Sequence, residues 1–558
     1  MFEKKELPIG IEDFKVLIDN HYYYVDKTKF LCELTRNIGK VNLFTRPRRF
    51  GKTLNLSMIQ RFFEKTDEDN AYLFDGLEVS KAGEQYMAYQ GQYPVIKLSL
   101  KGMKKDTYSA AMKHFSSIIA QECARHMDIQ GSDLLADVER ERFQRLRNEK
   151  GNENDLCLSL KMLSDCLMRI HGKKAIVLID EYDVPLENAH FKGYYDQMVG
   201  FIRSLFDNVL KTNDSLEMAV LTGCLRVSKE SLFTGLNNLQ ISSIRSNEFS
   251  SYFGFTEQEV RNLAEYYDIS DRFPVIKEWY DGYRFGKDEI YNPWSVLSFV
   301  REARHDNAFQ PAPFWSNTSS NSIIHELIVK ADEDTRDQIE ELINGRYVVA
   351  PVHEDMVYAD IEINREDIWS FLLFTGYLKP VESELRYNRL YCKMEIPNIE
   401  VESIYQQMIE QWFEETTRVE SRDDLVEALL SKNVEKVNDI IGRWLDETIS
   451  FYDAKEMYYH GFMSGLLSGL KGWKLVSNRE SGDGRPDLLL LQRRPQDVAV
   501  IIEIKEPEEG RTLDALADQA LKQIEEKRYE SEPLNDGYTT IIKYGAAFRK
   551  KKCLIKLG

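Results

Sequence analysis

Residues 46–53 have the composition of a loop that binds phosphate groups. They follow an apolar run at 41–44, read Arg-Pro-Arg-Arg-Phe-Gly-Lys-Thr, and lead directly into a helical pattern. In a strand, tight loop and helix N-terminus of this kind, backbone N–H groups and the helix dipole hold phosphates. We expect Lys52 to reach the β- and γ-phosphates of a nucleotide and the Thr53 hydroxyl to ligate Mg²⁺.

The loop departs from the usual phosphate-loop pattern, G-x-x-x-x-G-K-[ST], at its first position. Arg46 stands where the first glycine is expected, whereas Gly51 keeps the second. Pro47 could set the backbone angle φ needed for the turn. Two alternatives remain for Arg46, Arg48 and Arg49: they add positive charge beside the phosphates and belong to the nucleotide site, or they face solvent.

Asp180 and Glu181 supply the acidic half of a nucleotide site. They end the apolar run at 175–179, and α/β sheets bind their ligands at the carboxyl ends of strands. Asp180 would hold Mg²⁺, directly or through water, and Glu181 would be the general base for the attacking water. The alternative is a buried strand that ends in a solvated acidic turn. The phosphate loop upstream favours the nucleotide site.

A further strand predicted at 218–221 ends at Thr222 and leads to Arg226. In an NTPase of this architecture, such a position senses the γ-phosphate. Thr222 and Arg226 are therefore candidates for that role. The alternative is a purely structural threonine at the end of a strand, since polar residues at such positions also serve packing and turns.

Asp487, Glu503 and Lys505 could form a second site. Asp487 opens one predicted strand, and Glu503 and Lys505 stand two residues apart on the next, so they share a face. This set suits a Mg²⁺-dependent nuclease, with Asp487, Glu503 and the Ile504 carbonyl as oxygen ligands. The cation would make a bound water more acidic, and Lys505 would orient that water or contact the scissile phosphate. The alternative is a structural Glu–Lys pair at a strand edge.

Residues on both flanking helices are further candidates. Glu456 and His460 lie one helical turn apart before the cluster, and Gln523 and Tyr529 follow it. Surface or packing roles are the alternative for each. The region also has the local basic character that nucleic-acid contact needs, or else a solvated charged face, through Arg479, Arg485, Arg493, Arg494 and Lys505.

Three segments of different pattern divide the chain. Residues 1–255 alternate β-branched runs with amphipathic stretches, which predicts an α/β domain with a parallel sheet. Residues 256–400 are expected to form a helical lid or winged-helix-like region. Residues 401–558 are expected to form a helical linker and a compact α/β unit. The predicted strands are 41–44, 95–100, 175–179 and 218–221 in the first segment, and 473–476, 487–491, 498–504 and 539–544 in the last.

Composition limits the class of protein. The 558 residues, 43% hydrophobic and 30% charged, predict a soluble, multidomain globular chain. A net charge of −19 argues against coating of DNA by the whole molecule but allows contact through one basic face. Seven scattered cysteines fit neither a zinc site nor a disulfide framework, which favours a cytoplasmic location. The sequence shows neither a signal peptide nor an apolar run long enough to cross a membrane.

These motifs resemble two known families. Residues 44–53, 178–183, 221–233, 237–238 and 291–294 resemble the bacterial AAA-ATPase-like family, of which the Arg-Pro-Arg-Arg loop is itself a mark. Residues 477–487 and 502–505 resemble the PD-(D/E)xK nuclease superfamily domain that members of the family commonly carry at the C-terminus. The resemblance implies an ASCE-type core that binds ATP, a lid or winged-helix region, and a restriction-endonuclease-like domain.

The resemblance also implies roles for individual residues. The nucleotide roles fall on Lys52, Thr53, Asp180 and Glu181, and the nuclease roles fall on Asp487, Glu503 and Lys505. The superfamily often has an acidic residue on the first helix of the nuclease domain. Here Glu456 or His460 would fill that position, and the sequence does not choose between them.

We expect the nucleotide state of a P-loop ATPase to gate a C-terminal Mg²⁺-dependent DNA endonuclease. The first alternative is a nucleotide-gated switch whose C-terminal domain binds nucleic acid without cutting it. A second alternative makes the C-terminal fold an assembly surface, which would give a homo-oligomer with no effect of Mg²⁺. Roles in defence or in mobile-element biology follow by analogy alone.

Overall fold

The computed structural model describes the following residues: 4–36, 39–211, 213–226, 232–233, 238–306, 308–315, 333–343, 345–354, 366–416, 419–448, 456–468, 470, 472–477, 486–493, 497–505, 510–549 and 551–558. Among the residues singled out above, Arg479, Arg485, Arg494 and the side chain of Glu456 lie outside this set. The chain forms two compact units, residues 1–314 with 349–398, and residues 315–348 with 399–558.

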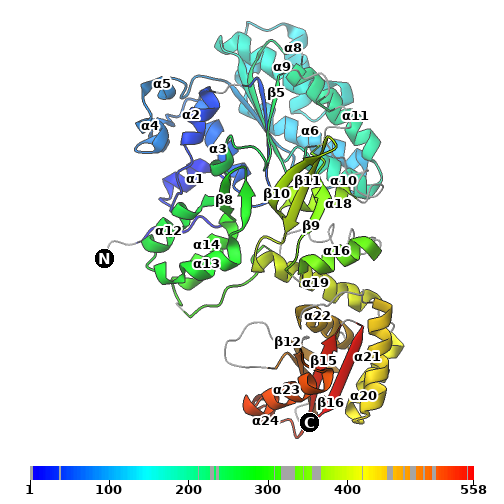
Figure 1. Ribbon diagram of the computed structural model, residues 1–558. Helices are drawn as coiled ribbons and strands as arrows, with labels where there is room; N and C mark the ends of the chain where they lie inside the picture. Colours follow the sequence, from blue (N-terminus) through cyan, green and yellow to red (C-terminus); the bar gives the residue numbers. More distant parts are fainter. Residues whose placement is uncertain are drawn as a thin grey trace. The chain divides into compact units, whose positions relative to one another are not determined.

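A five-stranded parallel sheet is the centre of the first unit. Its order is β2-β3-β4-β1-β5, and helices cover both of its faces (Figure 1). The predicted parallel α/β fold is confirmed, and all four predicted strands are present. The structure adds a fifth strand at the edge. The strands are β1 (Val41–Thr45), β2 (Val95–Ser99), β3 (Ala175–Asp180), β4 (Leu216–Gly223) and β5 (Leu239–Ser242).

Long amphipathic helices connect these parallel strands, as crossover connections require. The helix α9 (Glu153–His171) shows the local signals clearly: the Asn152 side chain accepts a hydrogen bond from the Asp155 N–H, and Gly172 ends the helix in the left-handed conformation. The other helices of this part are α1 (Phe14–Asp19), α2 (Lys29–Arg36), α3 (Lys52–Phe63), α4 (Glu78–Lys81), α5 (Glu84–Met87), α6 (Tyr108–Arg125), α7 (Asp128–Gly131), α8 (Asp137–Arg147), α10 (Val184–Lys192) and α11 (Tyr195–Phe206).

The rest of the first unit is largely helical, and it also contains two small antiparallel β arrangements. One is the three-stranded sheet β6-β8-β7, and the other is the hairpin β10–β11, which belongs to the sheet β10-β11-β9. The elements are β6 (Phe255–Thr256), α12 (Glu257–Tyr266), α13 (Phe273–Tyr280), β7 (Tyr283–Phe285), β8 (Asp288–Tyr291), α14 (Pro293–Ala303), β9 (Val348–Pro351), α18 (Asp367–Thr375), β10 (Lys379–Arg386) and β11 (Arg389–Glu395).

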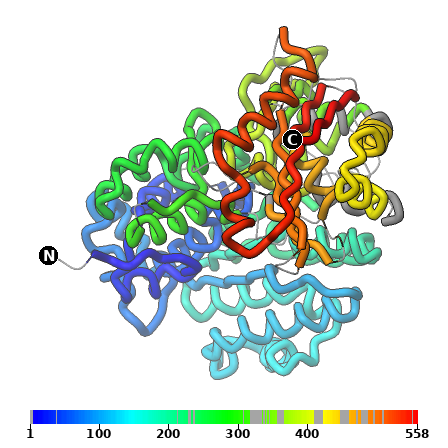
Figure 2. The backbone as a smooth tube through the Cα atoms, turned by 90° about the horizontal axis from the view of Figure 1, so that it is seen from below, coloured from blue at the N-terminus to red at the C-terminus, as the bar shows by residue number. Residues whose placement is uncertain are grey.

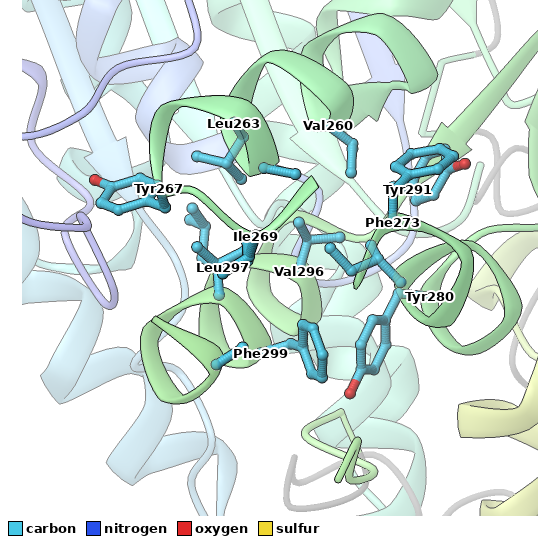
Figure 3. Packing of buried hydrophobic residues seen from close by; sticks show 14 of the residues in the cluster. Val260, Leu263, Tyr267, Ile269, Phe273, Tyr280, Tyr291, Val296, Leu297 and Phe299 are labelled. Carbon is cyan, nitrogen blue, oxygen red and sulfur yellow. The ribbon is translucent and has the colours of Figure 1, made fainter. Parts of the chain in front are cut away.

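Helices α12, α13 and α14 share an apolar core of their own. Val260, Phe273 and Val296 are among its buried residues, one from each helix (Figure 3). The N-terminal segment completes this core, because Leu7 is buried in the same cluster. Figure 2 shows this dark blue segment beside the green helices. Residues more than two hundred positions apart are thus joined by burial of apolar surface.

The second unit contains a five-stranded mixed sheet of order β12-β13-β14-β15-β16, in which only β14 and β15 pair in parallel. The predicted C-terminal α/β fold is confirmed, and β16 adds a strand that was not predicted. The strands are β12 (Trp473–Ser477), β13 (Leu488–Gln492), β14 (Val498–Lys505), β15 (Thr540–Arg549) and β16 (Lys552–Leu557). The helices are α16 (Glu333–Ile343), α19 (Ile399–Thr416), α20 (Val419–Leu430), α21 (Val434–Thr448), α22 (Glu456–Leu467), α23 (Leu513–Glu526) and α24 (Ser531–Asn535).

Across the described part of the chain, none of the helices combines the length and apolar character that a membrane span needs.

Arg46, at the end of β1, belongs to the core of the first unit. Its side chain is fully buried, and the guanidinium donates hydrogen bonds to the carbonyls of Thr45 (2.9 Å) and Ser242 (2.7 Å) and to the Ser242 hydroxyl (3.1 Å). It lies over the rings of Phe253 and Phe285. Burial lowers the pKa of the guanidinium to about 9, so it stays charged at neutral pH.

These contacts correct the solvent-facing alternative for Arg46. The side chain does not face solvent, and its Nη1 and Nη2 atoms donate to the end of β1 and to Ser242 on β5. A glycine at this position would leave those carbonyls without the guanidinium. Arg46 therefore ties the first residue of the phosphate loop to the edge of the sheet.

Replacing Arg46 by Ala should lower the free energy of unfolding by about 2–5 kcal/mol, because it leaves a cavity and removes donors from buried carbonyls. Denaturant titration without nucleotide would measure the change. Arg49→Ala is the matched control, since Arg49 is exposed and lies over the Trp294 ring, an interaction that contributes about 1 kcal/mol. A loss in Arg46→Ala no larger than that in Arg49→Ala would contradict the anchoring role.

Candidate functional site

The phosphate loop runs from the end of β1 to the first turn of α3. Gly51 is the N-cap of α3 and has a φ of 78°, a left-handed conformation that favours glycine. The Lys52 ammonium is buried and donates hydrogen bonds to the carbonyls of Arg46 (2.8 Å) and Pro47 (2.7 Å). The first turn of α3 carries no acidic residue, so its N–H groups and dipole can receive an anion without repulsion.

Asp180 joins three elements at the carboxyl edge of the sheet. The Thr53 hydroxyl donates to one carboxylate oxygen at 2.8 Å, and the Thr222 hydroxyl donates to the other. Asp180 is fully buried, so both oxygens need such partners. The sequence candidates Thr53, Asp180 and Thr222 thus meet, although they come from α3, β3 and β4. Carboxylate and hydroxyl oxygens are the ligands that Mg²⁺ prefers.

Glu181 begins the turn after β3 and is half-buried. Its φ of 52° is unusual for a residue with a side chain, and its N–H donates to the Thr222 hydroxyl at 3.4 Å. Burial raises the pKa of Glu181, the Lys52 charge opposes this, and Asp180 adds to it. A carboxylate with a raised pKa is a stronger base than an ordinary one, as activation of a water molecule requires.

Asp183 and Tyr182 hold the end of β4, a role that the sequence analysis missed. The buried Asp183 carboxylate accepts hydrogen bonds from the N–H groups of Cys224 (2.7 Å) and Leu225 (3.0 Å), and the Tyr182 hydroxyl donates to the Leu225 carbonyl (2.6 Å). A Cβ atom at Gly223 would lie 2.6 Å from the Tyr182 ring, so only glycine fits there. In the sequence, the second half of the Asp-Glu-Tyr-Asp motif at 180–183 is the feature that could have indicated this role.

The other arginines of the site lie in different surroundings. Arg48 forms an ion pair with Glu187 on α10, at 2.8 Å, and Arg49 lies 3.9 Å from the centroid of the Trp294 ring. Arg226 is half-buried one residue beyond the segment that Asp183 holds. Glu187 was not singled out from the sequence, and its position one helical turn after Asp183 was the available signal.

The C-terminal candidates meet between β13 and β14. The Asp487 carboxylate accepts the Ile504 N–H at 2.7 Å, and the Asp487 N–H donates to Glu503 at 3.3 Å. The Lys505 ammonium donates to Glu503 at 3.2 Å and to the Ile504 carbonyl at 3.0 Å. All three predicted residues are therefore in one cluster, and the ammonium lies against two oxygens of the predicted cation site.

Flanking residues orient this cluster. The Gln523 side-chain amide on α23 donates to Glu503 and lies 3.2 Å from the Tyr529 hydroxyl. His460 on α22 lies with Nε2 at 3.0 Å from the Asp487 carbonyl, so this nitrogen carries the proton and donates. His460 therefore contacts the cluster through the backbone carbonyl of Asp487. The side chain of Glu456, the other candidate on α22, lies outside the described residues.

The electrostatics of the cluster suit a bound cation. Glu503 is only 1% exposed, and burial, reinforced by Asp487, raises its pKa to about 7, whereas Lys505 opposes the shift. Within the described residues, no set of three or more His, Cys, Asp or Glu side chains is arranged as a metal site. The oxygens of Asp487, Glu503 and the Ile504 carbonyl nevertheless form a set of hard ligands that a divalent cation fits.

Comparison with known proteins finds a family match in the N-terminal part of the chain and another at residues 454–557. Residues 8–233 match the family described as Predicted AAA-ATPase, and residues 454–557 match the PD-(D/E)XK nuclease superfamily. A curated relative, "Uncharacterized protein in vnfD 5'region" from Azotobacter chroococcum mcd 1, is 29% identical over 331 residues. The alignment spans 59% of this chain and 57% of the relative. The chain therefore carries an AAA-ATPase-like domain in its N-terminal part and a PD-(D/E)XK nuclease superfamily domain at residues 454–557.

Proposed function

We propose that the protein hydrolyses ATP at the carboxyl edge of the parallel sheet and cleaves DNA at the Asp487–Lys505 cluster. The observation that carries the ATPase part is the convergence of Thr53, Asp180 and Thr222 beside Lys52. These groups come from separate elements and together supply an ammonium, a carboxylate and hydroxyls. Hydrolysis of a nucleoside triphosphate with Mg²⁺ requires this combination of groups.

Each residue of the first site has a separate role in hydrolysis. The N–H groups around Gly51 and the Lys52 ammonium hold the phosphates, and Thr53 and Asp180 hold the Mg²⁺ that enters with ATP. That cation neutralises charge on the phosphates. Glu181 takes the proton of the attacking water, and its raised pKa matches this task. The assignment of Thr222 and Arg226 as sensors of the γ-phosphate stays a prediction.

A specific observation favours the nuclease part: two carboxylates and an ammonium lie within hydrogen-bond reach around the Ile504 backbone. Asp487, Glu503 and the Ile504 carbonyl would hold Mg²⁺, which supplies a more acidic water and neutralises phosphate charge. Lys505 orients the attacking water or contacts the scissile phosphate. Gln523 keeps Glu503 in place through its hydrogen bond.

The proposal also includes control of cleavage by the nucleotide. Its support is that one chain carries both sites, each assembled from its own motif.

The seven cysteines are free thiols, most of them buried, which agrees with a reducing compartment such as the cytoplasm. The alternative, in which the C-terminal domain binds DNA without cutting it, keeps the nucleotide site and loses only the second activity.

Lys52→Ala should weaken ATP binding roughly 10- to 100-fold, because a hydrogen-bonded charge is lost from the phosphates. Glu181→Gln should bind ATP as wild type does but turn it over roughly 10²- to 10⁴-fold more slowly, since the general base is gone. Phosphate release and equilibrium binding of labelled ATP measure the two effects. Lys65→Ala, an exposed lysine beyond the end of α3, is the control. Unchanged ATP affinity in Lys52→Ala would refute the assignment.

The nuclease assignment predicts metal-dependent cleavage of DNA. Circular and linear DNA are incubated with the full chain, Mg²⁺ or Mn²⁺, and with or without ATP. We expect nicking that disappears in Asp487→Asn and changes in Lys52→Ala, whereas the exposed Asp536→Asn behaves as wild type. ATP turnover with no cleavage under any condition would favour the DNA-binding switch. Cleavage that is the same in Lys52→Ala would remove nucleotide control from the proposal.

Metal affinity at the second site should depend on pH. Burial raises the pKa of Glu503 to about 7, so below that pH a cation must displace a proton to bind. Affinity for Mn²⁺ should then fall by up to about tenfold per pH unit from pH 7 towards pH 5 and level off above pH 8. Calorimetric titration of Mn²⁺ at several pH values measures this. Glu503→Gln should bind weakly with a flatter profile, and a flat profile in wild type would contradict the role of Glu503.

A further inference from the structure

Arg48 is the phosphate-loop arginine that contacts a charged side chain of the nucleotide site. Its Nη2 atom donates hydrogen bonds to both carboxylate oxygens of Glu187, each at 2.8 Å. The two side chains are 22% and 10% exposed, so water screens the pair only in part. The contact joins the loop to a helix 139 residues further along the chain.

Glu187 is fixed relative to the catalytic turn. It lies in the first turn of α10, and its N–H donates to the Asp183 carbonyl at 2.9 Å. Asp183 in turn holds Cys224 and Leu225 at the end of β4. Glu187, the partner of Arg48, therefore lies in the same continuous stretch of chain as Glu181.

Lys52 and Arg48 both act on the surroundings of Cys224. Burial raises the pKa of the Cys224 thiol to about 11, and the charges of Lys52 and Arg48 oppose the shift, so both cations lie within electrostatic range of this thiol. The Lys52 ammonium lies 3.8 Å from the Cys224 sulfur. Asp180, Glu181, Asp183 and Glu187 supply carboxylates to this edge, and the charges of Lys101 and Arg49 also act on Glu181. A triphosphate that entered with Mg²⁺ would compete with Glu187 for the guanidinium, since phosphate oxygens suit its planar fork.

We propose that Glu187 is a positioning residue that pairs with Arg48 when no nucleotide is bound. When a nucleoside triphosphate binds, Arg48 leaves Glu187 and pairs with the nucleotide. Arg48 then contacts the terminal phosphate and stabilises the charge that develops during transfer. This inference rests on the proposed ATPase function and adds an arginine supplied by the same chain. A nucleoside diphosphate lacks the terminal group, so it leaves Arg48 with Glu187.

The exchange predicts effects of opposite sign for the two partners. Arg48→Ala removes the contact with the terminal phosphate and should lower kcat for ATP roughly 10²- to 10³-fold. Glu187→Gln keeps the shape of the side chain but releases Arg48, and should raise kcat or ATP affinity roughly two- to fivefold, the size of a partly exposed ion pair. Affinity for ADP should change little in either variant. The double variant should behave as Arg48→Ala does.

The experiment measures phosphate release and the binding of MgATP and MgADP by the full chain, with thermal unfolding of every variant. Arg48→Lys is the second variant: it keeps the charge and the ion pair but lacks the fork, so kcat should fall with little change in stability. Glu139→Gln is the control, since it removes one carboxylate from an ion pair with Arg169 between α8 and α9.

Four results decide between the inference and its alternatives. Opposite signs for Arg48→Ala and Glu187→Gln, with the double variant following Arg48→Ala, support the inference. A fall in turnover in both single variants, or no change in either, overturns it, because a merely structural pair gives effects of one sign. If these results overturn the inference but Lys52→Ala still loses ATP binding, the proposed ATPase function is retained. A wild-type protein that does not bind ATP refutes the proposed function itself.

Discussion

The hydrogen bonds of the Asp180 carboxylate are the constraint on which the first site depends. A fully buried carboxylate is costly unless both oxygens have donors, and here the donors are the hydroxyls of Thr53 and Thr222. Because β4 lies between β1 and β3, the Thr222 hydroxyl at the end of β4 reaches Asp180 at the end of the neighbouring strand β3. The order of strands therefore decides that the phosphate loop and the acidic turn meet.

Both candidate sites follow the same electrostatic principle. Each places carboxylates close together in a buried position and adds one ammonium, Lys52 in the first and Lys505 in the second. Burial raises the pKa of Glu181 and of Glu503, which means that each site favours the entry of positive charge. Under the proposed function, a divalent cation would supply that charge in both cases, alone or together with a nucleotide.

Local patterns in the sequence predicted the main strands and the two clusters because hydrophobic periodicity and motif spacing are properties of short segments. The strands that were missed are edge strands or short and polar, such as β5 (Leu239–Ser242) and β7 (Tyr283–Phe285). The surroundings of Arg46 and Arg48 could not be predicted. Their partners, Ser242 and Glu187, stand 196 and 139 residues away, and nothing in the loop itself indicates them.

The contacts of the loop also explain where change on nucleotide binding is to be expected. Arg46 fixes the start of the loop, the Phe50 ring packs at 4.9 Å against Tyr283, and a Cβ atom at Gly376 would lie 3.0 Å from Pro47. Backbone held on three sides in this way resists displacement, because close-packed groups cannot shift without new clashes. A response of the loop to a phosphate group therefore falls on its side chains, and Arg48, whose partner is a charged side chain, can exchange that partner without a shift of the backbone.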